Sequence, residues 1–354
     1  MQTHPRFALL LSVAAVFPLA QAASAQEGAA RYQLTFQGTW SSLTHPNQFP
    51  ISPHFSAVVG ATHSGAAVFW QPGALASNAI KDVAELGSWG LLWGEILQQV
   101  AVGHVDQGLQ FGALSPSPGQ KTVTFIAQAE FSKLTLVSML GPSPDWFVGI
   151  NGFELIQGGD WVESAVIPLQ LYDAGTDSGV SYASSNLPTV PPDAIALVSS
   201  ASGPFQGAST IVGSITLQRL SSTHAYGCSN PSGSLTTTGL AELGQTLQIS
   251  LADPTGQMPT PAASGLAFSG GSASNFPCGT MLPGFGLAVG VAGEILLGSL
   301  DGLMVGPSFT SGSSTFSITL PNQAALVGQQ FYFQGLFASA RLGVTRGLAI
   351  RIGY

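Results

Sequence analysis

This chain has very few charged residues. Only 7% of its 354 residues are Asp, Glu, Lys or Arg, against about a quarter in an ordinary soluble domain. Lys and Arg together number 9, and Asp and Glu number 17, so the formal net charge is −8. A chain this poor in cations has little with which to neutralise a phosphate backbone or an anionic membrane surface. The composition therefore argues against nucleic acid as a direct partner.

Long apolar runs are also missing beyond residue 25. No segment there approaches the ~20 apolar residues of a membrane-spanning helix, so no transmembrane segment is predicted. Residues 1–25 differ, because Arg6 precedes a short apolar core at 7–17, and Ala23-Ser24-Ala25 forms a small-residue cleavage site. This order is typical of a secretory signal peptide. We therefore expect a secreted protein that acts outside the cell or at the cell surface.

Cysteine is nearly absent, with only Cys228 and Cys278 in the chain. In an exported protein, two cysteines favour one disulfide. The chain-entropy model gives such a loop a stabilising contribution of about 4 kcal/mol. Two buried free thiols are the alternative.

Tryptophan and cysteine divide the chain into two parts. All six tryptophans lie before residue 220, and both cysteines lie after it. The segment 221–234 between them is rich in turn-forming residues. We therefore expect a signal peptide at 1–25, a first domain at 26–222 and a second domain at 223–354.

Strand-like runs occur along the whole chain, either alternating in polarity or rich in β-branched and aromatic residues. They fall at residues 32–36, 55–61, 66–70, 121–128, 129–139, 161–171, 194–199, 210–220, 246–251, 287–291, 294–300, 314–320, 329–336 and 347–352. Helical signals are confined to one region, where Ser77 is a candidate N-cap, Gly87 is a stop and Leu91–Val100 forms a second helix. An all-β fold with short helices is predicted, and the second domain has the short strands of a β-sandwich.

Acidic residues collect in the segment that begins at Gly141. They are Asp145, Glu154, Asp160, Glu163, Asp173, Asp177 and Asp193. No Lys or Arg occurs between Lys133 and Arg219, so these carboxylates have no cation nearby in the sequence. Such groups need water, a proton or a metal ion. We hypothesise that some of them bind calcium, although turn-forming Asp residues that accept from their own backbone are the alternative, and no EF-hand pattern is present.

Motifs of known catalytic sites are missing as well. The sequence contains no G-x-S-x-G, H-E-x-x-H or C-x-x-C pattern. Two of the residues Glu154, Asp160 and Glu163 could supply a glycosidase pair, but nothing in their spacing selects one. His45, His54 and His63 lack the further ligands of a zinc site and are interpreted as structural. The chain is therefore predicted not to be an enzyme.

Seven short motifs match one known family in their order and spacing. They are YQLTFQGTW at 32–40, THP at 44–46, HFSAVVGATHS at 54–64, DVAELGS at 82–88, GPSPDWFVGI at 141–150, YDAGTDSG at 172–179 and SSNLPTVP at 184–191. With these motifs, residues 31–220 resemble the spondin N-terminal (F-spondin) domain family. The resemblance implies a C2-type antiparallel β-sandwich that binds calcium, in a secreted matrix or cell-surface adhesion protein. On the motif match, the calcium ligands are Asp145, Asp173 and Asp177.

The chain also departs from that family. Residues 26–227 contain no cysteine, and no Cys-rich thrombospondin repeat follows. The part from residue 227 onward resembles instead a β-rich module of exported bacterial proteins, through YGCS at 226–229, LVGQQFYFQ at 326–334 and LAIRIG at 348–353. The four acids outside the expected ligand set, Glu154, Asp160, Glu163 and Asp193, are interpreted as solvated turn or edge residues.

Together these patterns predict a calcium-stabilised extracellular binding or adhesion module. Its partner is expected to be a cell-surface or matrix protein or glycan. A structural component of a surface layer or matrix is the alternative, and a glycan-acting hydrolase is a remote one. An exposed apolar patch beside the calcium loops would favour the first, and self-association without the first domain would favour the second.

Overall fold

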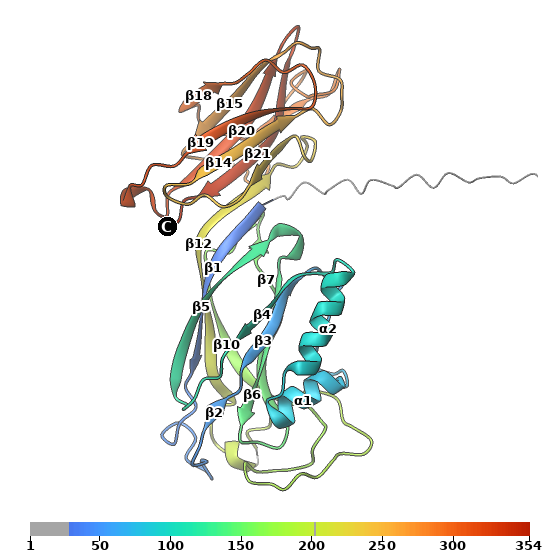
Figure 1. The fold of residues 1–354 in the computed structure, drawn as a ribbon, viewed down its shortest axis with the longest axis vertical. Helices are drawn as coiled ribbons and strands as arrows, with labels where there is room; N and C mark the ends of the chain where they lie inside the picture. The colour runs from blue at the N-terminus through green and yellow to red at the C-terminus, as the bar shows by residue number, and fades with distance from the viewer. Residues whose placement is uncertain (1–27, 202) are drawn as a thin grey trace, which may run out of the picture.

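The computed structural model describes residues 28–201 and 203–354, so the predicted signal peptide lies outside the described residues. The chain forms two β-rich parts stacked along the long axis of the molecule (Figure 1). All strand pairs between named strands are antiparallel in the described residues. No described helix is long and apolar enough to cross a membrane. The predicted all-β fold class is confirmed.

The first part is a sandwich of two sheets. Its strands are β1 (Gly28–Gly38), β2 (His54–Phe55), β3 (Val58–His63), β4 (Val105–Phe111), β5 (Gly119–Gln128), β6 (Lys133–Gly141), β7 (Trp146–Glu154), β8 (Ile156–Gln157), β9 (Asp160–Trp161), β10 (Ser164–Asp173), β11 (Ala196–Leu197) and β12 (Ile211–Tyr226). One sheet has the order β5-β1-β12-β10, and the other has β10-β7-β6-β3-β4. Strand β10 belongs to both, because residues 164–170 pair with β12 and residues 171–173 pair with β7.

Alternating side chains fill the space between these sheets. In β1, Tyr32, Leu34 and Phe36 point into the core and are almost fully buried, as the period of two predicts. Neighbouring positions on β6 face opposite ways, since Leu136 joins this core and Val137 packs beneath the helices. One face of the second sheet is therefore buried in the sandwich and the other is covered by helix.

The helices α1 (Asn78–Leu86) and α2 (Gly90–Ala101) lie on that second face (Figure 1). The Ser77 hydroxyl accepts from the Ile80 amide at 3.2 Å, and Gly87 ends α1 with a φ of 65°. Both predicted helices are confirmed. The ends of α1 could be predicted because capping depends on residues that are close together in the sequence.

Two predicted strands are wrong. Residues 66–70 are not a strand, although Ala67, Phe69 and Trp70 are buried in the core under the helices. The apolar run reflects packing of a connecting segment rather than pairing. Residues 287–291 also lie outside the strands. The longer strands with no counterpart among the predicted runs are β4, β7, β13, β15, β16 and β18.

The second part is another antiparallel sandwich, as predicted. Its strands are β13 (Leu235–Thr238), β14 (Thr246–Ala252), β15 (Ala263–Ser269), β16 (Thr280–Leu282), β17 (Gly293–Ile295), β18 (Gly302–Val305), β19 (Ser313–Thr319), β20 (Gln330–Ala338) and β21 (Leu342–Arg351), and short 3₁₀ turns occupy Ala129–Phe131, Gly203–Phe205 and Ala324–Leu326. The sheet β13-β14-β19 faces β18-β15-β20-β21 across a separate apolar core.

The predicted disulfide between Cys228 and Cys278 is present, with their Cα atoms 5.1 Å apart. The buried carboxylate of Glu294 lies beside it and accepts from the amides of Cys228, Ser229 and Gly279 at 2.7–2.8 Å. A carboxylate held by several backbone amides is satisfied without a cation. Glu294 therefore ties together the two segments that the disulfide joins.

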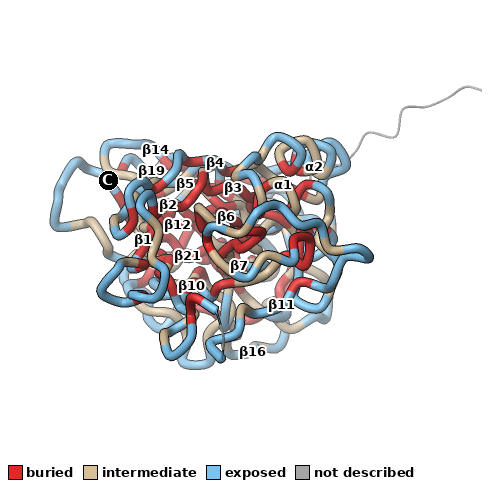
Figure 2. The backbone as a smooth tube through the Cα atoms, turned by 90° about the horizontal axis from the view of Figure 1, so that it is seen from below, coloured by how far each residue is buried: buried red, intermediate tan, exposed pale blue. Residues whose placement is uncertain are grey.

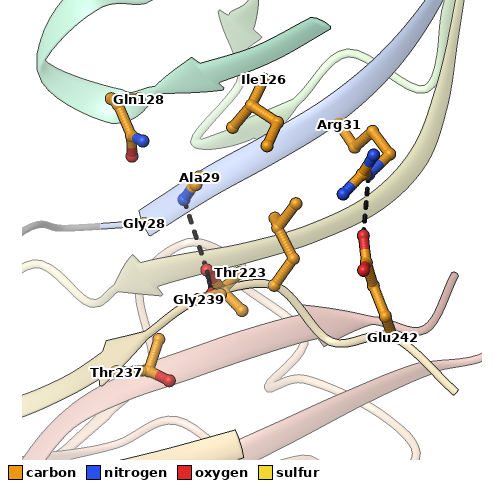
Figure 3. A pocket seen from close by; sticks show the side chains of 10 residues that line it. Gly28, Ala29, Arg31, Ile126, Gln128, Thr223, Thr237, Gly239 and Glu242 are labelled. Carbon is orange, nitrogen blue, oxygen red and sulfur yellow. Dashed lines mark hydrogen bonds and ion pairs between the residues drawn. The ribbon is translucent and has the colours of Figure 1, made fainter. Parts of the chain in front are cut away.

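Strand β12 connects the two parts without a break. It is 16 residues long, and it pairs with β1 over most of its length and with β21 at Ser222–Tyr226. Beside this crossing, Arg31 of β1 forms an ion pair of 2.7 Å with Glu242 of the second part. The pair closes one side of a cavity of about 220 Å³ between the parts (Figure 3).

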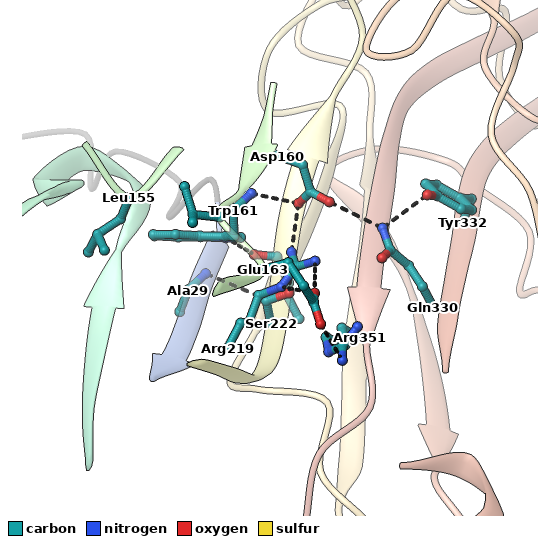
Figure 4. Close-up of polar contacts among 12 residues, drawn as sticks. Ala29, Leu155, Asp160, Trp161, Glu163, Arg219, Ser222, Gln330, Tyr332 and Arg351 are labelled. Carbon is teal, nitrogen blue, oxygen red and sulfur yellow. Dashed lines mark hydrogen bonds and ion pairs between the residues drawn. The ribbon is translucent and has the colours of Figure 1, made fainter. Parts of the chain in front are cut away.

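A second group of charges at this joint corrects one sequence expectation. Asp160 and Glu163 were expected to be solvated, and Glu163 is indeed 49% exposed, but that expectation missed that both bind Arg219 of β12, at 3.0 and 2.9 Å. Glu163 also binds Arg351 of β21 at 2.7 Å, and Asp160 accepts from Gln330 at 3.2 Å (Figure 4).

Glu154 was also expected to be solvated, and it pairs with Lys133 at 2.9 Å on the neighbouring strand. The cations that are absent from residues 134–218 are thus supplied by strands outside that segment.

The three histidines are at least partly explained by local contacts. His63 is buried, and its ring nitrogens lie 2.7 Å from the Thr135 hydroxyl and the Ser64 carbonyl. His45 is buried too, with Nε2 at 2.8 Å from the Ser209 carbonyl. His54 contacts the Ser52 carbonyl at 2.9 Å. These contacts agree with the structural interpretation.

We predict that Arg219→Met destabilises the protein by about 2–4 kcal/mol, because it leaves Asp160 without its cation, whereas Glu163 keeps Arg351. The Arg219 side chain is only 4% exposed. Lys133→Met is the matched control, since that pair is about one-third exposed on both sides and should contribute less than ~1 kcal/mol. Urea denaturation measures both changes, and equal losses would contradict the prediction.

A second prediction concerns acid. Burial lowers the pKa of His63, with Lys133 and Glu154 nearby acting in opposite directions. Below the ordinary histidine pKa of about 6.5 the unfolded chain therefore binds more protons than the folded one, and the free energy of unfolding decreases as the pH falls. Denaturation at several pH values between 7.5 and about 5 should show a shallower loss in His63→Gln than in the parent. Parallel pH curves would show that His63 does not cause the loss.

Candidate metal site and the loops around it

Three aspartates lie near one another at the end of the first sandwich that is farthest from the second part. Asp145 ends the turn between β6 and β7, Asp173 ends β10, and Asp177 lies in the loop that follows β10. Antiparallel neighbours bring these three chain segments to the same edge. The loops there form the lower end of the molecule in Figure 1.

Asp145 is the centre of this arrangement and is fully buried. Its Oδ2 atom accepts from the amides of Thr176 and Asp177 at 2.7 and 3.0 Å. Its carbonyl accepts from the amide of Ala174 at 3.1 Å. The Oδ1 atom is buried and has no hydrogen-bond partner among the described residues. A buried carboxylate oxygen without a partner is costly, and it is available to a ligand.

The other two aspartates hold the loop in place. Asp173 accepts from the Trp146 indole at 3.2 Å and from the Gly175 amide at 2.8 Å. Asp177 accepts from the amides of Gly179 and Leu187 at 2.7 and 3.1 Å. These contacts agree with the alternative interpretation of turn-forming aspartates. They leave further lone pairs on each carboxylate, so they do not exclude a metal ion.

Gly175 is required by the path of this loop. Its φ is +72°, and a Cβ atom there would collide with the Asp193 carbonyl. The Asp193 amide donates to the Gly175 carbonyl at 2.9 Å. A fourth carboxylate therefore lies beside the three expected ones. The sequence showed Asp193 among the seven acids, but its distance of 16 or more residues from the other aspartates hid this proximity.

The electrostatics of the cluster favour a cation. Burial, and next the charge of Asp173, raise the pKa of Asp145 to about 6. Burial also raises the pKa of Asp173, with Asp193 and Asp177 adding to the effect. In the described chain, no Lys or Arg forms an ion pair with any of these four aspartates. The negative charges of these aspartates repel one another, and only a bound cation or a proton would neutralise them.

Whether the aspartates can hold a calcium ion depends on how close together their oxygens lie. Calcium ligands lie 2.3–2.6 Å from the ion, so two of its ligand atoms are at most about 5 Å apart. Among the described residues, the only three ligand-type side chains whose atoms all lie within 4.8 Å are Cys228, Cys278 and Glu294, and there both cysteines are in the disulfide. Asp145, Asp173 and Asp177 come from neighbouring loops but are not such a group, so in this structure their three carboxylates are not close enough together to contact one ion.

The loops around the aspartates expose several large apolar side chains. Leu43, Ile51 and Val190 are 93%, 104% and 86% exposed, and Val180 and Leu187 are also exposed. Seen from this end, exposed loops surround the buried strands (Figure 2). The loop of Leu43 packs on the others, because Asn47 donates to the Gln206 carbonyl at 2.9 Å and Trp40 lies 5.3 Å from Tyr182 between ring centres.

Comparisons with known proteins identify relatives of the part of the chain that contains these aspartates. A family model described as Spondin_N matches residues 30–209, a range that includes all four aspartates. Spondin-1 of Gallus gallus is 42% identical over 176 residues, which cover 48% of this chain and 22% of that protein. Spondin-2 of Homo sapiens is 34% identical over 177 residues, which cover 49% of this chain and 54% of that protein.

The chain therefore spans about a fifth of the length of Spondin-1 and about half of the length of Spondin-2. Among solved structures, Escherichia coli alpha-2-macroglobulin activated by porcine elastase is 8% identical, with a TM-score of 0.19 over 88% of this chain and 32% of that chain. A likeness of that size carries no structural argument.

Proposed function

This chain belongs to the Spondin_N family, and on that premise we propose that it is a secreted, calcium-binding module for extracellular binding or adhesion. The match over residues 30–209 agrees with the resemblance predicted for residues 31–220. The observation that carries the proposal is the set of exposed apolar loop residues beside the aspartates. That combination was the feature expected to favour a binding module over a purely structural component.

Calcium would be held by Asp145, Asp173 and Asp177, with Asp145 Oδ1 as the ligand atom that has no other partner. When bound, the ion would supply positive charge to a cluster of carboxylates that has no Lys or Arg partner. The three residues themselves connect the turn before β7, the end of β10 and the following loop. We infer that the ion stabilises these loops and does no chemistry.

The exposed apolar loops support a partner at this end. Ile51 and Val190 are about as exposed as in an extended chain, and several exposed apolar side chains at one end of a domain can provide an interaction site. A cell-surface or matrix protein or glycan is the proposed partner. A structural role through self-association is the competing function, and it predicts that the second part alone assembles.

The placement of the other acids supports a non-catalytic function. Glu154, Asp160 and Glu163 were the candidates for a glycosidase pair. Glu154 pairs with Lys133, and the other two are bound by Arg219 at the joint between the parts. A carboxyl acting as general acid requires a raised pKa and access to substrate.

We predict that calcium raises the melting temperature of the chain from residue 26 onward. A ligand at about 100 times its Kd adds ~2.7 kcal/mol to the free energy of unfolding, which corresponds to a shift of roughly 5 °C for a domain of this size. Scanning calorimetry after chelation, with and without millimolar calcium, measures it. Asp145→Asn should remove most of the shift, and Asp173→Asn or Asp177→Asn should reduce it.

Asp301→Asn is the matched control for that experiment. Asp301 is an acid on the second part and accepts from the Gly270 amide at 2.7 Å, so its removal should leave the calcium shift intact. An unchanged melting curve for the parent in calcium would count decisively against the site. An equal calcium shift in Asp145→Asn would show that the ion binds at another site.

Adhesion is tested with the exposed loop residues. The double variant Ile51→Ser/Val190→Ser should bind at least about tenfold more weakly, a difference of ~1.4 kcal/mol, to those members of a panel of immobilised matrix proteins and polysaccharides that the parent binds. Val166→Ser is the control, because Val166 is 71% exposed on β10 away from the loops. Equal loss in both variants, or no binding by the parent, contradicts the proposed binding surface.

A further inference from the structure

A surface cavity of about 480 Å³ opens directly beside the aspartate loops. Its volume falls in the range of about 300–1,000 Å³ that is usual for ligand sites. Trp146 and Phe205 form a buried aromatic floor, with ring centres 5.5 Å apart. Val180 and Leu197 are exposed at its rim. The walls are therefore mainly aliphatic and aromatic.

Among the described residues, Asp173 is the only charged one that lines the cavity. It is fixed in position, because the Trp146 indole donates to its Oδ2 atom at 3.2 Å and the Gly175 amide donates to its Oδ1 atom at 2.8 Å. The carboxylate and the indole ring are thus adjacent in one wall. A fixed carboxylate in an otherwise apolar wall is a favourable environment for an organic cation, through a charge-assisted hydrogen bond.

The charges around the cavity point the same way. Asp145, Asp177 and Asp193 are close enough to Asp173 for their charges to interact with it or with one another. The sequence from residue 134 to 218 holds no Lys or Arg. One bound calcium ion would leave two of these four negative charges uncompensated, so the cavity attracts cations with or without the metal.

We propose that this cavity binds an aliphatic cation, the lysine side chain of a partner protein, with the ammonium group at Asp173 and the methylene stem against the exposed side chains of Val180 and Leu197. The inference rests on the proposed function as a binding module and names the chemistry of its partner. A carboxylate ligand is disfavoured by the same charges. A neutral apolar ligand would use the walls but not the fixed carboxylate.

The test uses three small probes of equal length with the ¹⁵N-labelled chain from residue 26 onward. They are n-pentylammonium, 1-pentanol and pentanoate, titrated in chelator and again in saturating calcium. We expect n-pentylammonium to shift the backbone amide signals of Gly179, Val180 and Leu197 and to bind at least fivefold more tightly than pentanol. Pentanoate should cause no shift there. Calcium should weaken the binding of n-pentylammonium without abolishing it.

Two variants identify the groups responsible. Asp173→Asn keeps an acceptor for the Trp146 indole and should reduce the affinity for n-pentylammonium at least fivefold, to that of pentanol. Leu197→Arg changes a half-exposed residue of the cavity lining and should block binding by placing a guanidinium at Asp173. This variant leaves Asp173 and its hydrogen bonds unchanged, so it tests the cavity even if Asp173→Asn alters the loop. Asp301→Asn, an acid on the second part, should bind like the parent.

The results separate this inference from the proposed function. Equal binding of ammonium and alcohol, binding that survives Asp173→Asn, or no amide shift with any probe overturns the lysine site. The calcium shift in melting temperature, measured on the same sample, reports the metal independently. A normal calcium shift with no ammonium binding therefore rejects only the cavity, and ammonium binding without a calcium shift rejects only the metal.

Discussion

The pairing of one long strand is the constraint on which the whole structure depends. Strand β12 forms backbone hydrogen bonds with β1 and β10 in the first sandwich and continues far enough to pair with β21 in the second. A continuous strand transmits its direction and twist to every strand beside it. The ion pairs Arg31–Glu242 and Glu163–Arg351 then join side chains of both parts across the same joint. The aspartates consequently lie at the end of the first sandwich that faces away from the joint with the second part.

The acids of residues 141–193 divide into two groups by what surrounds them. Asp160, Glu163 and Glu154 have cations supplied by other strands, and they serve the fold. In the described chain, Asp145, Asp173, Asp177 and Asp193 have no Lys or Arg partner. The buried carboxylate of Asp145 accepts from two backbone amides through Oδ2, and its Oδ1 atom has no hydrogen-bond partner. The uncompensated group lies where the apolar loops are exposed and where the cavity opens. That coincidence of charge, exposed apolar surface and concave shape is the basis for placing binding at this end.

Much of the architecture follows from local patterns. The alternation of Tyr32, Leu34 and Phe36 and the capping of α1 by Ser77 and Gly87 depend on near neighbours, and both were predicted correctly. The same reasoning failed at residues 66–70, because burial under helices produces the same apolar run as a strand. It also failed for Asp160 and Glu163, whose arginine partners are 56 or more residues away in the sequence. No rule based on spacing detects a partner that only strand pairing brings near.

The sequence by itself determined the family, the β-rich class, the helix caps, the cysteine pair and the three aspartates on which the metal hypothesis rests. These are local or motif-level properties, and they persist however the chain is later arranged. Only the tertiary structure decided which acids have cationic partners, that Asp193 lies beside Gly175, and that Trp146, Phe205 and Asp173 line one cavity. The reason is physical. Burial and charge compensation are properties of neighbours in space, and in an antiparallel sandwich those neighbours come from strands far apart in the sequence.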